Sequence, residues 1–285
     1  MTFLILAIVL SGLLVLIFKG FTIYEVDILQ AIWVNYLVCV VMASLTKGQF
    51  AIESGFWKES WFPYAFILGF IFVTSFTLIG HTVKKYGITV GAIMQKMSLI
   101  VSVTAAFILY KEDITFLKIF GILLAMLATI LANIPKDSKK MKFELGMMPI
   151  LVLVLSGIIE IGLQYVEKNV IGTSADLGFI AFLFLTAGIV GLTYFLTLLS
   201  QGKAKFERKS IIAGIVLGIP NFASIYYLMK TLGDGWDGSV VFPIINVGII
   251  IFAAIGAIVI FKEKLSTYNW VGVFLAVLSI VIISL

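Results

Sequence analysis

The strongest constraint on this chain is a series of ten apolar runs, each 17 to 24 residues long, separated by short polar breaks. A helix that crosses a hydrocarbon core of about 30 Å needs roughly 20 apolar residues. A membrane β-barrel would instead show alternating segments of about ten residues. We therefore expect an all-α membrane protein with ten transmembrane helices. The predicted spans are Thr2–Phe18, Asp27–Thr46, Phe62–Lys84, Ile88–Tyr110, Phe116–Ile134, Met147–Val166, Leu177–Ser200, Ser210–Leu232, Ser239–Phe261 and Tyr268–Ser284.

The composition argues against a soluble protein. Only 12% of the 285 residues are charged and 61% are hydrophobic, whereas a soluble domain is about 25% charged. In a membrane protein, the excess of basic residues that gives the net charge of +5 is expected in cytoplasmic loops. The predicted partner is therefore the lipid bilayer and not nucleic acid. Cys39, the single cysteine, lies in an apolar run and supports neither a disulfide framework nor a thiolate metal site. No metal or cofactor is expected.

The second half of the chain repeats the first. Eight residues recur 151 positions later, and weaker matches place Leu10-Ser11-Gly12 opposite Leu155-Ser156-Gly157. A shared apolar composition can imitate a repeat, but matched Lys-Glu and Gly positions at one offset argue against that reading. Residues 1–140 and 145–285 thus form two five-helix repeats, and because five is odd, the second is inverted about an axis in the membrane plane. The matched residues are Val90, Ile93, Ala106, Lys111, Glu112, Gly121, Ala125 and Leu127, with Val241, Ile244, Ala257, Lys262, Glu263, Gly272, Ala276 and Leu278.

On these residues the sequence resembles the drug/metabolite transporter superfamily, in particular tandem EamA-domain proteins. The resemblance is carried by Tyr110-Lys111-Glu112 with Gly121 and by Phe261-Lys262-Glu263 with Gly272, and it covers nearly the whole chain. It implies ten helices, a central cavity between the two halves and alternating access. It names no substrate.

Two ionisable residues, Lys96 and Glu160, fall deep inside predicted spans. At 1.5 Å per residue they lie about 12 Å and about 20 Å from the same membrane face, within reach of a buried ion pair. A charge at such depth costs roughly 2.5–3.5 kcal/mol, which makes these residues functional candidates. The pair is either a static staple between the halves or a site for substrate or a coupling proton.

Polar residues accompany both charges. Ser156 and Gln164 lie four residues before and after Glu160, on one face of its helix. Gln95 and Ser98 flank Lys96, and Asn246 is the repeat equivalent of Gln95. For these side chains, interhelical hydrogen bonds and substrate contacts are equally compatible with the sequence.

Two prolines are candidate hinges. Pro220 removes the hydrogen bond to the Val216 carbonyl and follows a Gly214-to-Gly218 GxxxG pattern, which predicts close packing, then a bend beside Asn221. Pro243 could open the first turn of its helix, so that carbonyls near Asn246 face a cavity. Both are equally readable as ordinary kinks.

Charge in the loops predicts the orientation. Six lysines lie on the side of the termini, and thirteen lysines and arginines lie opposite. The positive-inside rule therefore places both termini outside the cell membrane (the inner membrane of a bacterium).

We expect a secondary active transporter that moves a small polar or amphipathic metabolite, amino-acid-like or drug-like, by alternating access. The sequence has no GxxxxGK[ST] loop, so a gradient would supply the energy, and Glu160 would carry the proton. That role is similar to the buried glutamate of small multidrug resistance proteins, by position only. A gradient-independent exchanger or facilitator, a channel and a non-transporting scaffold remain alternatives, and the oligomeric state is open. An enzyme is not expected, because the chain has one histidine and neither an HExxH nor a GxSxG motif.

Overall fold

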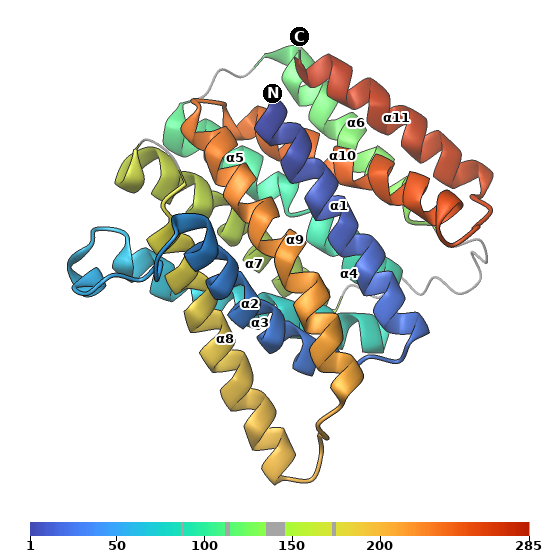
Figure 1. Cartoon of the computed structure of the whole chain (residues 1–285). Helices are drawn as coiled ribbons and strands as arrows, with labels where there is room; N and C mark the ends of the chain where they lie inside the picture. Colours follow the sequence, from blue (N-terminus) through green and yellow to red (C-terminus); the bar gives the residue numbers. More distant parts are fainter. Residues whose placement is uncertain (87, 112–114, 135–145, 173–174, 285) are drawn as a thin grey trace. The chain divides into compact units, whose positions relative to one another are not determined.

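The computed structural model describes residues 1–86, 88–111, 115–134, 146–172 and 175–284 (Figure 1). Across these ranges the regular structure is helical, and nine helices are long and apolar enough to cross a membrane. The predicted all-α fold of a multi-pass membrane protein is confirmed at this level. The helices are α1 (Thr2–Ile23), α2 (Ile28–Lys47), η1 (Phe56–Lys58), α3 (Phe62–Tyr86), α4 (Ile88–Lys96), α5 (Leu99–Tyr110), α6 (Phe116–Ala132), α7 (Met147–Tyr165), η3 (Val166–Ile171), α8 (Leu177–Ser200), α9 (Arg208–Gly233), α10 (Gly238–Val259) and α11 (Thr267–Ser284).

Aspartates set the starts of two corresponding helices. The Asp27 carboxylate accepts a hydrogen bond from the Gln30 backbone N–H (2.7 Å) at the start of α2. The Asp176 carboxylate accepts one from the Phe179 N–H (2.8 Å) at the start of α8. Each cap satisfies a backbone donor that the first helical turn leaves open.

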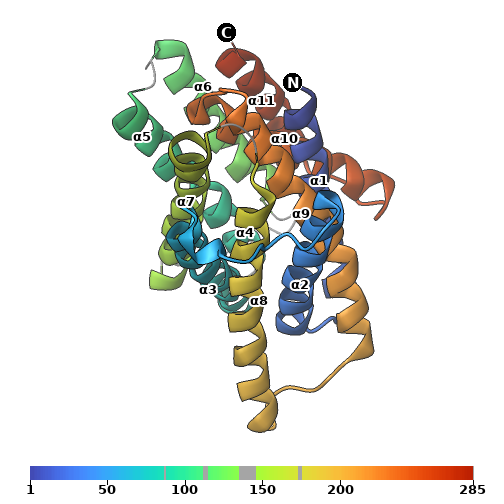
Figure 2. The same cartoon turned by 60° about the vertical axis from the view of Figure 1, so that its left-hand side comes forward.

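The chain forms two compact units, and each unit takes helices from both halves of the sequence. The first unit contains Met1–Thr74 and Tyr165–Asp234, and the second contains Ser75–Gln164 and Gly235–Leu285. In the first unit α2 packs against both α8 and α9, and α1 runs beside α9 (Figure 1). In the second unit α6 lies against α11 (Figure 2).

Glycines allow close helix contacts in the first unit. A Cβ at Gly218 would lie 2.5 Å from the Val38 Cβ, and one at Gly214 would lie 2.5 Å from the Ala31 carbonyl oxygen. The predicted close packing of the GxxxG pattern is therefore present, with α2 as its partner. Gly69 of α3 plays the corresponding part against α8, where a Cβ would lie 2.7 Å from the Leu183 carbonyl oxygen.

The second unit contains a reciprocal pair of glycine contacts. Gly121 of α6 packs on Ile283 near the end of α11, and Gly272 of α11 packs on Ala132 at the end of α6. The 151-residue offset makes Gly121 equivalent to Gly272, and Ala132 equivalent to Ile283. The two glycine contacts are therefore equivalent to each other under the repeat. The two helices run in opposite directions.

The predicted span Ile88–Tyr110 is long and apolar enough to cross a membrane over Val90–Tyr110, but its helix is interrupted, because α4 ends at Lys96 and α5 begins at Leu99. The Met97 N–H still bonds to the Ile93 carbonyl (2.8 Å), but the Val101 N–H reaches only three residues back, to Ser98 (2.8 Å). No proline or glycine marks this break. In contrast, α9 and α10 continue through Pro220 and Pro243, so the hinge role of these prolines stays a prediction.

The helix of Glu160 also ends later than predicted. Beyond Val166 the chain continues as the π-helical turn η3 to Ile171, and the Gly172 N–H bonds to the carbonyl of Glu167 (2.9 Å). Gly172 then adopts a φ of +84°, a left-handed conformation that glycine tolerates without strain. Glu167, which sequence reasoning placed beyond the span, therefore lies within the helical segment.

Candidate functional site

Four predicted residues of the second unit meet in one hydrogen-bonded group, here called the polar cluster: Lys96, Ser98, Glu160 and Asn246. The Lys96 Nζ donates to the Asn246 Oδ1 (3.0 Å). The Asn246 Nδ2 donates to the Glu160 Oε1 (3.4 Å), and the Ser98 Oγ donates to the same oxygen (3.1 Å). The group is part-buried and is built from α4, α5, α7 and α10.

The predicted direct ion pair is corrected by this geometry. In the described part of the chain, Lys96 and Glu160 form no ion pair with each other, and the amide of Asn246 lies between them. An amide suits this position because its oxygen accepts from the ammonium while its nitrogen donates to the carboxylate. The Lys96 ammonium and the Glu160 carboxylate are linked only through the Asn246 amide. Each charged group can therefore take another partner without breaking a direct bond to the other.

The helix break explains why the cluster tolerates two charges. Lys96 is the last residue of α4, and a cation at a helix C-terminus is stabilised by the helix dipole. Ser98 is the N-cap of α5, yet its hydroxyl makes no cap bond and donates to Glu160 instead. The Glu160 carboxylate therefore lies at a helix N-terminus, where anions are favoured.

One carboxylate oxygen of the polar cluster accepts no hydrogen bond from the described residues by geometry. This oxygen, the Glu160 Oε2, is buried, while the Ser102 hydroxyl, which donates to the Leu99 carbonyl (3.3 Å), lies close enough to act on the carboxylate. A proton, or a donor group of a bound molecule, would satisfy this oxygen.

The other predicted residues of this region lie outside the hydrogen bonds of the cluster. Ser156 is buried one turn before Glu160 on α7, and Gln95 is half-buried on α4. Gln164 is fully buried, and its amide lies against Gly238 at the start of α10. Any Cβ at position 238 would overlap that amide, so glycine there makes room for Gln164.

Asn221 belongs to a different group, in the first unit. Its Nδ2 donates to the Asn35 Oδ1 (3.1 Å), and the Cys39 thiol donates to the Gly218 carbonyl (3.4 Å). Asn221 and Asn35 are both buried, and Pro220 adjoins the group on α9. The predicted site residues are thus divided between the two compact units.

Sequence reasoning missed Glu167. This side chain is 0% exposed, and neither carboxylate oxygen has a hydrogen-bond partner among the described residues. The sequence predicts that the apolar run ends at Val166, because Glu167-Lys168-Asn169 resembles a solvated break. The only sequence signal was the renewed apolar pair Val170-Ile171, which follows these polar residues.

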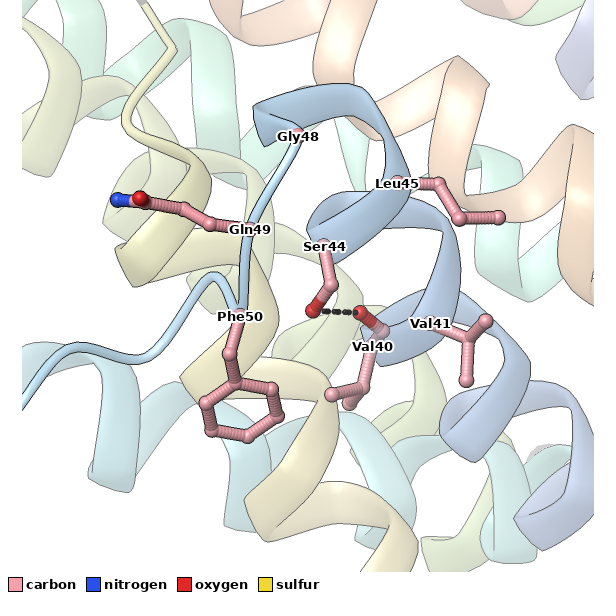
Figure 3. A pocket seen from close by; sticks show the side chains of 7 residues that line it. All are labelled: Val40, Val41, Ser44, Leu45, Gly48, Gln49 and Phe50. Atoms are coloured by element: carbon pink, nitrogen blue, oxygen red, sulfur yellow. Dashed lines mark hydrogen bonds between the residues drawn. The ribbon is translucent and has the colours of Figure 1, made fainter.

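A pocket of about 360 Å³ lies at the end of α2, and its lining contains no residue of the polar cluster or of the Asn221 group (Figure 3). Its lining is mainly apolar, and within it the Ser44 hydroxyl donates to the Val40 carbonyl (3.0 Å). Val41, Leu45 and Phe50 are more than half exposed, as is usual for side chains that face lipid. No set of three or more His, Cys, Asp or Glu side chains that could hold a metal ion occurs among the described residues.

Comparison with known proteins gives the fold but no function. The sequence matches no protein-family profile. A protein of Haemophilus influenzae (strain ATCC 51907 / DSM 11121 / KW20 / Rd), described as "Uncharacterized protein", is 28% identical over 214 residues, which are 74% of this chain and 71% of the relative. A solved structure titled "Crystal structure of protein" superposes with a TM-score of 0.76, covering 99% of this chain and 94% of that chain at 12% identity. The chain therefore shares its fold with a known structure.

Proposed function

We propose that the protein is a secondary active transporter of the drug/metabolite transporter type, which moves a small polar or amphipathic metabolite across the cell membrane by alternating access. The observation that carries this proposal is the polar cluster at the α4–α5 break, where Asn246 bridges Lys96 and Glu160. Broken helices whose ends face charged groups within the membrane are typical binding sites of secondary transporters.

The proposal includes two inverted five-helix repeats, 1–140 and 145–285. Three observations support it: the antiparallel α6 and α11, their reciprocal glycine contacts, and the left-handed φ of Lys111 (53°) and Lys262 (52°), which the repeat makes equivalent. A two-fold axis along the membrane normal would make α6 and α11 parallel, so an axis in the membrane plane fits better. By the charge of the loops, both termini lie outside.

The cluster suits a zwitterion such as an amino acid. A substrate carboxylate would pair with Lys96, and a substrate ammonium would pair with Glu160, in place of the two bonds that Asn246 now makes. Proton coupling would use Glu160, whose buried Oε2 accepts no hydrogen bond from the described residues by geometry. A proton on Glu160 would weaken ammonium binding, so proton and substrate would exclude each other.

Counterflow in proteoliposomes tests the proposal. Ligands would be selected by thermal shift in detergent, and vesicles preloaded with unlabelled ligand should accumulate the labelled form transiently. Glu160→Gln should remove the pH dependence of this flux, whereas Glu53→Gln, an exposed carboxylate on a loop, should not. Simple equilibration of label would indicate a channel, and absence of any flux would indicate a scaffold. If flux through the unchanged protein does not depend on pH, the protein is a facilitator or an exchanger that is not coupled to protons.

Labelling tests the inverted topology separately. Lys111 and Lys262 are both exposed, and Cys39, the single cysteine, is fully buried. A membrane-impermeant thiol reagent applied outside intact cells should label Lys111→Cys but not Lys262→Cys, and the unchanged chain is the background control. Labelling of both variants from one side would exclude the inverted repeat.

A further inference from the structure

Glu167 stands apart from every other carboxylate of the described chain, because it is completely buried and neither oxygen has a hydrogen-bond or ion-pair partner there. It lies in the π-helical turn η3 of the first unit, and its backbone carbonyl is already bonded to the Gly172 N–H. η3 is the last turn of the helical segment that begins with α7, and Gly172 caps its C-terminus.

Among the described residues, the charged side chain that acts on Glu167 is also acidic. The carboxylate of Asp176, which caps α8, is close enough to act on Glu167, and it has the same sign. From α3, Tyr64 packs on Tyr165, the residue directly before η3. The titratable groups of α9, which packs against η3, are Arg208, Lys209, Tyr226, Tyr227 and Lys230.

One cation of α9 contacts aromatic rings. The Lys230 ammonium lies 4.8 Å from the ring centre of Tyr226 and 5.2 Å from that of Phe3. Cations over aromatic faces at such distances are attracted to the rings. On η3 itself, Lys168 follows Glu167 in the chain and is half-buried.

An ionised carboxylate without hydrogen bonds or a counter-ion is strongly disfavoured in such a place, whereas a neutral acid is not. We infer that Glu167 is a proton-binding site, at which the first unit holds a carboxylic acid in neutral solution. The proton sits on a carboxylate oxygen of Glu167 and leaves only when water or a base reaches that oxygen. This site is distinct from Glu160 of the polar cluster. It does not depend on the proposed transport activity.

Infrared spectroscopy of the reconstituted full-length protein at neutral pH tests the inference directly. The spectrum should contain the carbonyl stretch of a protonated carboxylic acid, and Glu167→Gln should lose one carboxyl's share of that band. Glu53→Gln, whose carboxylate pairs with Lys47 at 2.7 Å, should leave the band unchanged. The Glu160→Gln variant measures any part of this infrared band that comes from Glu160 of the polar cluster. An unchanged acid band in Glu167→Gln would overturn the inference.

Thermal unfolding gives a second measurement that needs no flux. If the folded protein holds a proton that the unfolded chain releases, stability falls as pH rises above the value for an ordinary unfolded glutamate. The unfolding midpoint of the unchanged protein should therefore fall by a few degrees more than that of Glu167→Gln between weakly acidic and neutral pH. Equal pH slopes would contradict the inference. If the unfolding midpoint depends on sodium ions and not on pH, and only when Glu167 is present, then Glu167 binds a metal cation and the proton-binding inference is wrong.

Discussion

Glu160 and Glu167 lie seven positions apart on one continuous helical segment, yet their surroundings are opposite in character. Glu160 accepts hydrogen bonds from Ser98 and Asn246, through which it is linked to the ammonium of Lys96. Glu167 is wholly buried, and among described residues neither of its oxygens has a partner. Depth in the membrane therefore does not by itself set the charge of a carboxylate. The donors that other helices bring to it do so.

Replacing Glu160 should change stability more than replacing Glu167. Glu160→Gln removes the charge that balances Lys96 and should lower stability by about 3 kcal/mol, as when one partner of a buried charge network is lost. Glu167→Gln replaces a neutral acid by a neutral amide of the same shape and should change stability by no more than about 0.5 kcal/mol at neutral pH. Denaturant unfolding of both variants in detergent measures the contrast. A loss of about 3 kcal/mol in both variants would mean that both carboxylates are ionised, and a loss below about 0.5 kcal/mol in both would mean that both are neutral.

The second prediction isolates the bridging amide. Asn246→Leu leaves two charged groups without a hydrogen bond that each now makes, and should cost about 1–3 kcal/mol. Gln95→Leu is the matched control, because position 95 is the repeat equivalent of 246 but lies outside the cluster's hydrogen bonds. If both leucine variants lose the same stability, the bridge has no special role.

The third prediction applies the same reasoning to neutral groups in the first unit. Asn221→Leu removes the hydrogen bond to the Asn35 Oδ1 and should cost about 1 kcal/mol, since both partners are uncharged amides. The bond from the Cys39 thiol to the Gly218 carbonyl should persist. A loss as large as that of Asn246→Leu would show that charge is not what distinguishes the polar cluster. The unfolding midpoint in detergent is again the measurement.

The fourth prediction, with the smallest effect, uses an exposed carboxylate as the reference. A hydrogen bond from Lys47 lowers the pKa of Glu53 below its ordinary value. Any stability from this pair is therefore present above the pKa of an unfolded glutamate and is lost as pH falls through the lower folded value. At neutral pH, Glu53→Gln should shift the unfolding midpoint very little, because exposed ion pairs are screened by water and salt. A large shift would mean that the Lys47–Glu53 loop is structurally critical.

Much of the architecture follows from residue order alone. Run length and the absence of charge predict membrane helices, because an apolar segment of this length has no other stable place, and Asp27 and Asp176 mark two of the helix starts. The candidates Lys96, Ser98, Glu160 and Asn246 were also found from sequence, because ionisable and amide side chains at such depth are rare. Their hydrogen-bond partners were not found, since those depend on the rotation of four helices.

The amino-acid order is enough to show that the chain is apolar and helical along nearly its whole length, and which few polar side chains interrupt the runs. Only the tertiary structure decided that α4 ends at Lys96, that Asn246 separates Lys96 from Glu160, and that Glu167 is buried. The physical reason is the range of the interactions. Helix formation depends on neighbours within a turn or two, whereas the charge and burial of a side chain depend on residues tens to more than a hundred positions away that pack against it.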